Sequence, residues 1–141
     1  VRNEYRDGRI IKLLWKGLAT YIVKSNVEYI FGCASFPSSN HNRFLSQLSY
    51  LHHYHCPSED LQTNPVDNLK AEFQVIGKEK ISNEKEFRSL PPLIKAYLRV
   101  GAYVGSGAVI DKNFDTTDVL IILDTKKLLK KYSNLSKGLT K

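Results

Sequence analysis

Segments with helical periodicity alternate along this chain with short apolar runs of strand character, and this alternation narrows the choice of fold. From Ile10 to Ile22, apolar residues recur in steps of three and four, which predicts an amphipathic helix. Residues 29–36 (YIFGCASF) are an apolar and aromatic run that stops at Pro37, which predicts a buried strand followed by a turn. The order of these elements predicts a mixed α/β fold.

The rest of the chain continues the same alternation of predicted elements. Helices are expected at residues 41–55, 93–100 and 125–135, and strands at residues 71–76, 102–110 and 118–123. We expect Asn40 to cap the helix at residues 41–55. Pro92 suits the first turn of the helix at residues 93–100, and Gly101 is expected to end it.

Length and composition limit the class of protein further. With 141 residues, 42% of them hydrophobic, the chain predicts one domain with a modest core. Its 2 cysteines do not form a disulfide framework, and Cys33, inside the predicted strand, is expected to be a small buried apolar residue. No apolar run approaches the roughly 20 residues that cross a bilayer. These features predict a cytoplasmic location.

Charge is concentrated at the two ends of the chain. The formal net charge is +7, and residues 125–141 contain 6 lysines and no acidic residue, whereas the middle of the chain is mildly acidic. Basic ends attract an acidic partner such as a carrier protein, anionic lipid, a phosphorylated cofactor or nucleic acid. The tail at residues 125–141 is predicted to lie on an anionic membrane surface, or to be a solvated helix. No motif for a nucleic-acid-binding module is present, so that class is disfavoured.

A glycine-containing turn precedes the first predicted helix. Gly8 lies at the start of that helix, and Arg6, Arg9 and Lys12 surround it. Free backbone N–H groups, the positive end of the helix dipole and these cations together predict a cradle for a phosphate group.

The run at residues 50–56 (YLHHYHC) places titratable side chains on one helix. His52 shares a helix face with His55 and Cys56, but a zinc site needs further ligands that no second Cys/His cluster supplies, so no metal is predicted. A tyrosine or histidine here is a candidate proton donor or acceptor. Asp115 and Asp118 are candidate turn caps or partners for a substrate ammonium group.

Five blocks of the chain, in order, resemble the bacterial ornithine-lipid synthases, the L-ornithine Nα-acyltransferases. The blocks are EYRDGRIIKLLWKGLA, YIFGCASF, LSYLHHYH, LPPLIKAYLRVGAYVGSGAVID and FDTTDVLIILD. The resemblance extends from Tyr5 to Asp124 and implies a hemolysin-like branch of the acetyltransferase (GNAT) superfamily. Its fold is a central mixed, twisted sheet flanked by helices. The first strands of that fold would precede residue 1, so residues 1–141 are expected to be the C-terminal part of a single GNAT-like domain.

The resemblance also implies a reaction. A (3-hydroxy)fatty acyl group would pass from the phosphopantetheine thioester of acyl carrier protein to the α-amine of L-ornithine, giving lyso-ornithine lipid, without a separate cofactor. Related N-acyltransferases with another amine acceptor, of the glycine-lipid or acyl-homoserine-lactone type, are the alternative. The lipid product and the basic tail at residues 125–141 together predict that the protein contacts the inner face of the cell membrane.

Candidate site residues follow from the resemblance together with the charges that the substrates carry. Tyr50 matches the tyrosine that protonates the leaving thiolate, with His53 and Tyr54 as alternatives. The phosphate of the donor would be held by Arg6, Gly8, Arg9 and Lys12. Two positions of this loop differ from the superfamily pattern, because Tyr5 stands in place of Arg or Gln and Ile10 in place of a small residue. Lys95 or Arg99 is expected to bind the ornithine carboxylate, and Asp118 or Asp115 its side-chain ammonium group. The general base would precede residue 1.

Overall fold

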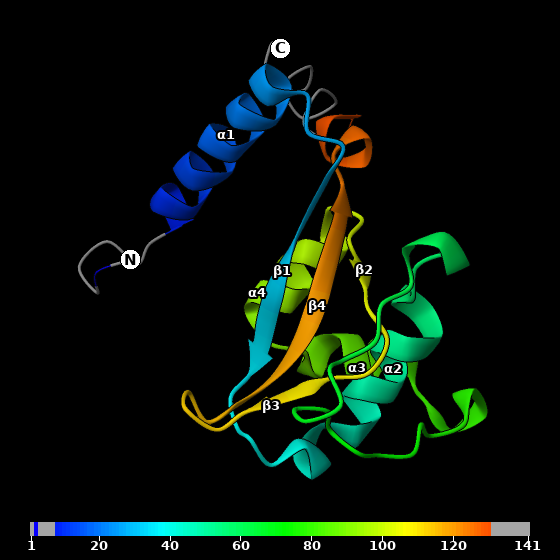
Figure 1. Cartoon of the computed structure of the whole chain (residues 1–141). Coiled ribbons are helices and arrows are strands. Elements are labelled where there is room, and N and C mark those ends of the chain that lie inside the picture. Colours follow the sequence, from blue (N-terminus) through cyan, green and yellow to red (C-terminus); the bar gives the residue numbers. More distant parts are fainter. Residues whose placement is uncertain (1, 3–7, 131–141) are drawn as a thin grey trace. The chain divides into compact units, whose positions relative to one another are not determined.

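The computed structural model describes residue 2 and residues 8–130, and the chain divides into two compact units (Figure 1). Unit 1 comprises Val1–Ile30 and Asp124–Lys141, and unit 2 comprises Phe31–Leu123. The elements, in order, are α1 (Gly8–Ser25), β1 (Tyr29–Phe36), η2 (His41–Phe44), α2 (Leu45–His55), η3 (Glu59–Leu61), η4 (Lys78–Lys80), α3 (Asn83–Ser89), α4 (Pro92–Arg99), β2 (Tyr103–Val104), β3 (Val109–Asp111) and β4 (Thr116–Asp124).

Unit 1 joins α1 to the segment that follows β4. The helix predicted from Ile10 to Ile22 is confirmed as α1, and Asn26, with a φ of 49°, follows its last turn in the left-handed conformation that often ends helices. Thr125 holds the junction, because its backbone N–H donates to the Glu28 carbonyl at 3.0 Å and its hydroxyl to the Val27 carbonyl at 2.6 Å. Residues 125–130 are helical, and the rest of the predicted tail lies outside the described residues.

Unit 2 contains a sheet in which β4 is the central strand. The strand order is β1-β4-β2, and β3 also pairs with β4. β2 and β3 are antiparallel to β4, with Tyr103 opposite Ile122 and Val109 opposite Asp118. Helices and sheet together confirm the predicted α/β class. Thr117, one of the buried residues of β4, donates its hydroxyl hydrogen to the Ser38 carbonyl at 2.7 Å.

The prediction of a fully buried strand at residues 29–36 is wrong in part. β1 has the predicted bounds, but only Ala34 and Phe36 are buried, whereas Phe31 is 78% exposed and Cys33 is also exposed. β1 lies at the end of the strand order and has β4 as its one neighbour. Successive side chains of a strand point to opposite faces, so one face of β1 enters the core and the other does not.

The helices of unit 2 follow their sequence signals closely. The helix expected at residues 41–55 is confirmed as the short η2 and then α2, with Phe44, Leu48 and Leu51 buried. Asn40 makes no side-chain capping bond, contrary to prediction; its backbone N–H donates instead to the Ser38 hydroxyl at 3.1 Å. α4 confirms the predicted third helix and ends before Gly101, whose φ is 89°.

Two predicted strands differ in the structure. Residues 71–76 are extended but form no strand, and one bridge, between Lys70 and Val109, joins this segment to the sheet. The strand expected at residues 102–110 is split into β2 and β3. Gly107 lies in the break with a φ of 72°, and a Cβ atom there would approach Pro65 Cγ to 2.9 Å. A side chain at this turn would therefore be strained and would also clash.

In the described part of the chain, no helix is both long and apolar enough to cross a membrane.

Candidate functional site

The C-terminal half of α2 brings together a tyrosine and a histidine. Tyr50 is buried, and its hydroxyl shares a hydrogen bond of 2.9 Å with Nε2 of His55. The ring of Tyr54 stacks on that of Tyr50 at a centroid distance of 5.2 Å, and the Lys78 ammonium lies 4.8 Å from the centroid of the Tyr54 ring. The Tyr50 ring is therefore fixed by contacts on its face and at its hydroxyl.

Burial sets the protonation of this pair. It raises the pKa of Tyr50, with a smaller contribution from Tyr54, and it lowers the pKa of His55. Desolvation disfavours the charged form of both groups, which is the phenolate of one and the imidazolium of the other. At neutral pH the pair is thus a protonated phenol bonded to a neutral imidazole, and the phenol proton is the one available for transfer.

Tyr50 and His55 line an open hollow between α2, α3 and α4. Its other lining residues are Asn83, Glu84, Phe87, Arg88, Leu98 and Arg99. The Arg99 guanidinium lies 5.6 Å from the centroid of the Phe87 ring. The structure therefore places two predicted site residues, Tyr50 and Arg99, in one hollow. Lys95 does not line it, and its Nζ donates to the Arg88 carbonyl at 3.0 Å.

His53 has different surroundings from Tyr50. Its Nε2 donates to the Ile76 carbonyl at 2.7 Å, because a carbonyl oxygen can only accept, and this bond fixes the proton on Nε2. Ser49 supports the same segment, since its hydroxyl oxygen accepts from the Ile76 N–H at 2.9 Å. The two predicted catalytic residues are thus not brought together: Tyr50 pairs with His55, and His53 anchors residue 76.

A second hollow contains Asp118. One carboxylate oxygen of Asp118, Oδ1, is buried and has no hydrogen-bond partner among the described residues. The residues that line this hollow are Cys33, Asn68, Leu69, Lys70, Val109, Ile110, Asp111, Lys112, Asn113 and Asp118. A buried carboxylate oxygen without a donor costs free energy unless a donor is supplied, so the Asp118 site suits a cationic N–H group.

Asp115, the alternative to Asp118, has a structural role in the turn before β4. It has a φ of 52°, and its carboxylate accepts hydrogen bonds from the backbone N–H and the hydroxyl of Ser39. These two bonds, the one from the hydroxyl first, lower the pKa of the Asp115 carboxyl. Asp115 therefore links the end of β1 to the start of β4, as a turn residue does.

The predicted phosphate cradle lies partly outside the described residues. Arg6 is outside them, and Gly8, Arg9 and Lys12 lie in the backbone of α1, whose first turn contains no acidic residue. Over residue 2 and residues 8–130, no three His, Cys, Asp or Glu side chains gather as a metal site.

Comparison with known proteins gives a clear relationship. The chain is 40% identical over 134 residues to the L-ornithine N(alpha)-acyltransferase of Rhizobium meliloti, covering 95% of this chain and 45% of that protein. It is 39% identical over 132 residues to the enzyme of the same name from Brucella abortus, covering 94% of this chain and 47% of that protein. The chain is a homologue of the L-ornithine Nα-acyltransferases. The resemblance predicted from the sequence is confirmed.

A third relative has a lower identity to this chain. The L-ornithine N(alpha)-acyltransferase of Rhodobacter capsulatus is 35% identical over 132 residues, covering 94% of this chain and 50% of that protein. The chain thus spans about half the length of the curated relatives it matches. No family model matches the chain. No solved structure matches it either.

Sequence reasoning missed His55 as the partner of Tyr50, and it missed Lys70, which lines the hollow of Asp118. His55 is the last residue of α2, so its side chain can turn back along the helix and reach the Tyr50 hydroxyl. A histidine at the end of the predicted helix is therefore the signal that the sequence contains. Nothing near Lys70 in the sequence indicates its position, since the bridge to Val109 places it there.

Proposed function

We propose that the full-length protein transfers a fatty acyl group to the α-amine of L-ornithine and so makes lyso-ornithine lipid. The observation that carries this proposal is the identity of 35% to 40% with proteins named for ornithine acylation, over nearly the whole of this chain. We place residues 1–141 in one GNAT-like acyltransferase domain together with the further sequence that the relatives contain. The helix-covered sheet of unit 2 is consistent with that assignment.

The donor in this proposal is acyl carrier protein, which presents the acyl group as a phosphopantetheine thioester and needs no further cofactor. In this proposal the phosphate binds at the start of α1, to Arg6, Gly8, Arg9 and Lys12, because the N-terminus of a helix attracts anions. The basic charge near both ends of the chain favours an acidic donor protein. The lysines of residues 125–141 support contact with an anionic membrane, which would receive the lipid product.

The acceptor site in this proposal is the hollow of Asp118. The unpartnered Oδ1 of Asp118 would accept a hydrogen bond from the side-chain ammonium group of ornithine. Lys70 and Lys112 line the same hollow and can bind the carboxylate of a zwitterionic amino acid. Lys95 and Arg99 remain the alternative carboxylate partners, and Arg99 is the better placed of the two because it shares a hollow with Tyr50.

The reaction in this proposal is direct attack of the neutral α-amine on the thioester carbon. The C–N bond forms, the C–S bond breaks, and the sulfur takes the hydroxyl proton of Tyr50 as it leaves. Burial keeps Tyr50 protonated at neutral pH, but its raised pKa also makes it a weak acid, so its contribution belongs at the low end of general acid catalysis, about 100-fold. His53 is the alternative donor; because its Nε2 proton is bonded to the Ile76 carbonyl, it could donate only from a ring that is also protonated on Nδ1. The attacking amine gives up its proton to a base, which in this proposal lies in the part of the relatives that this chain does not cover.

The decisive experiment measures thiol release from acyl carrier protein by the full-length protein with a panel of amines. Release with L-ornithine and a product acylated on the α-amine are expected. Release with glycine or homoserine lactone in its place would move the assignment to the related acceptor class. Absence of release with every amine, from a folded protein, would overturn the acyltransferase function.

The role of Asp118 has its own measurement. The variant Asp118→Asn keeps the size of the side chain but removes the charge that pairs with the ammonium group, so the KM for ornithine should rise about tenfold while kcat changes little. Asp67→Asn, at an exposed position outside the hollow, is the matched control. An unchanged KM in Asp118→Asn would refute this acceptor site.

A further inference from the structure

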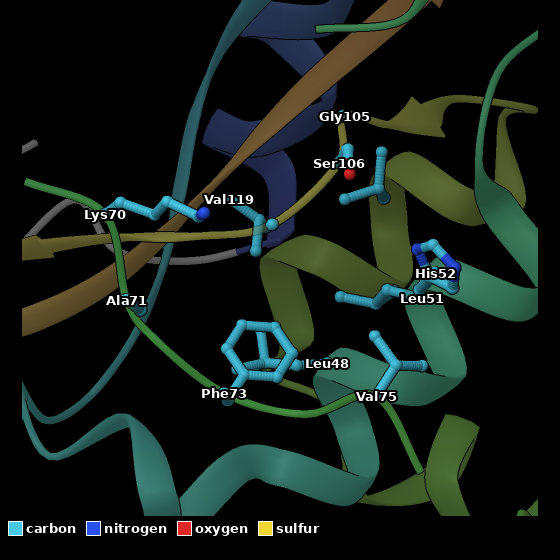
Figure 2. Close-up of a pocket in the computed structure, with 12 residues that line it drawn as sticks. Leu48, Leu51, His52, Lys70, Ala71, Phe73, Val75, Gly105, Ser106 and Val119 are labelled. Atoms are coloured by element: carbon cyan, nitrogen blue, oxygen red, sulfur yellow. The ribbon is translucent and has the colours of Figure 1, made fainter. Parts of the chain in front are cut away.

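An apolar cavity of about 160 Å³ lies in unit 2 between α2, the 70–75 segment and the sheet (Figure 2). The residues that line it are Leu48, Leu51, His52, Lys70, Ala71, Phe73, Val75, Val104, Gly105, Ser106, Gly107 and Val119. Lys70 also lines the hollow of Asp118, whereas neither Tyr50 nor His53 contributes to the cavity. Protein interiors are close-packed and contain few voids larger than a water molecule, so a cavity of this size needs an explanation.

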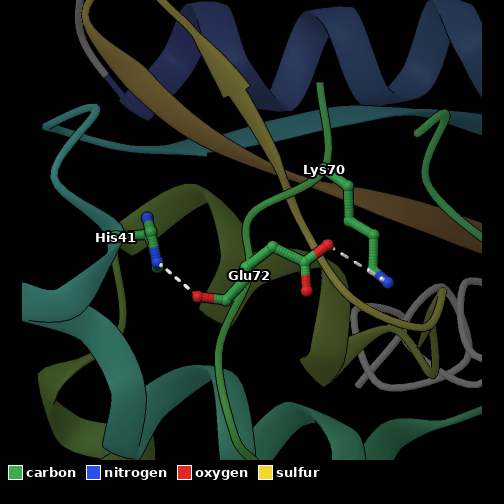
Figure 3. A network of polar contacts seen from close by, with 3 residues as sticks. All are labelled: His41, Lys70 and Glu72. Carbon is green, nitrogen blue, oxygen red and sulfur yellow. Dashed lines mark hydrogen bonds and ion pairs between the residues drawn. The ribbon is translucent and has the colours of Figure 1, made fainter. Parts of the chain in front are cut away.

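Residues 70–76 form one wall of the cavity, and hydrogen bonds and an ion pair fix its position. Figure 3 shows His41 Nε2 donating to the Glu72 carbonyl at 3.0 Å and the Lys70 ammonium paired with the Glu72 carboxylate at 3.5 Å. At one end of the wall the Ala71 N–H donates to the Ala108 carbonyl at 2.9 Å, and at the other Ile76 is bonded to α2 through Ser49 and His53.

These bonds explain why the cavity does not close. They fix the backbone of residues 71–76 at a set distance from α2, so Phe73 and Val75 cannot move inward to fill the space. The cavity is therefore preformed, as ligand sites usually are.

The chemistry of the lining selects the class of ligand. Leu48, Leu51, Val104 and Val119 are buried and offer hydrocarbon surface. The polar side chains of the lining are those of His52, Lys70 and Ser106, and Figure 2 shows His52 and Lys70 on opposite sides of the cavity. An apolar interior with a few polar groups at its edge fits an amphiphile whose hydrocarbon end enters the cavity.

We propose that this cavity binds part of the hydrocarbon tail of the acyl substrate. This inference rests on the proposed acyl transfer and adds to it a binding site for the tail. The volume of the cavity is close to that of the ~150 Å³ apolar cavity that accommodates benzene, so it holds a short stretch of hydrocarbon. The amide-bearing pantetheine arm does not suit such a lining.

The test is a binding experiment on the full-length protein that does not require turnover. The probes are dodecanoate, hexanoate and pantetheine, and the readouts are titration calorimetry and methyl chemical shifts. Because the cavity accommodates only a short stretch of either chain, we expect dodecanoate and hexanoate to bind with similar affinity and both to shift the methyl signals of Leu48, Leu51 and Val104. Pantetheine should leave these signals unchanged.

Two variants reduce the cavity from different positions. Val75→Phe adds volume at the edge, where Val75 is 41% exposed, and Ala71→Val adds it at a buried position. Because each buried methylene changes affinity about fourfold, either variant should weaken dodecanoate binding by about tenfold. Val66→Phe adds the same ring at a position that is 58% exposed and outside the cavity, so its binding should match that of the unaltered protein.

The possible results separate this inference from the proposed function. Dodecanoate binding that neither variant weakens, without methyl shifts at the cavity, would overturn the tail site even if acyl transfer is observed. Binding that both variants weaken would support the tail site even if no amine is acylated. If one variant fails to fold, the other variant and the methyl shifts of the unaltered protein decide.

Discussion

The two sides of α2 differ in what they present and in how they are held. On one side, Tyr50 lines an open hollow that also contains Arg99, and the His55 side chain reaches the Tyr50 hydroxyl from the end of the helix. On the other side, Leu48 and Leu51 face an apolar cavity whose far wall is held by side-chain bonds from the same helix. One helix can therefore position a proton donor and also hold open a space for hydrocarbon. Three variants test this difference.

The largest effect is expected from Tyr50→Phe. Loss of the hydroxyl removes the proposed proton donor while the ring is retained, so kcat should fall about 100-fold with little change in the KM for ornithine. Tyr29→Phe, at a position that is 43% exposed, is the control and should keep full activity. Should Tyr50→Phe retain kcat while His53→Gln loses it, the proton donor would be His53, and the division between the two sides of α2 would fail.

A smaller effect is expected from Ser49→Ala, on the cavity side. The Ser49 side chain is fully buried, and its removal leaves the Ile76 N–H without its acceptor, which should lower the free energy of unfolding by about 1–3 kcal/mol. Ser46→Ala, three residues earlier on the same helix, is the matched control. Urea unfolding of both variants measures the difference, and equal stabilities would show that Ser49 does not hold the cavity wall.

The smallest effect is a pH dependence that comes from His55. Burial lowers its pKa in the folded protein below the unfolded value of about 6.5, so the unfolded chain binds more protons in acid. The free energy of unfolding should therefore fall as the pH drops below about 6.5, and His55→Gln should reduce that fall. Urea unfolding from pH 8 to pH 5 is the measurement. Gln62→Asn, at an exposed position with no titratable side chain, is the control and should leave the pH dependence unchanged.

Elements with strong local signals were predicted well from the sequence. The apolar periodicity of α1 and the Pro92 and Gly101 signals around α4 act within a few residues, and the structure confirms them. α3 was not predicted, because its seven residues, NEKEFRS, are mostly polar and carry no apolar period.

Features that depend on distant neighbours were not predicted. The burial of β1 depends on which segments pack against each of its faces, and residues 71–76 are held by side chains of α2 rather than by a ladder of strand bonds. The candidate site shows the same limit: Tyr50 was identified by resemblance, but its bond to His55 and the cavity on the other side of α2 arise only when the segments pack.

The Thr125 junction has a consequence for biosynthesis. The hydroxyl of Thr125 bonds to the Val27 carbonyl across a sequence separation of 98 residues. At about 5–20 residues per second, Thr125 leaves the ribosome some 5–20 s after the end of α1. The two parts of unit 1 can therefore be joined at Thr125 only after the whole of unit 2 has been synthesised.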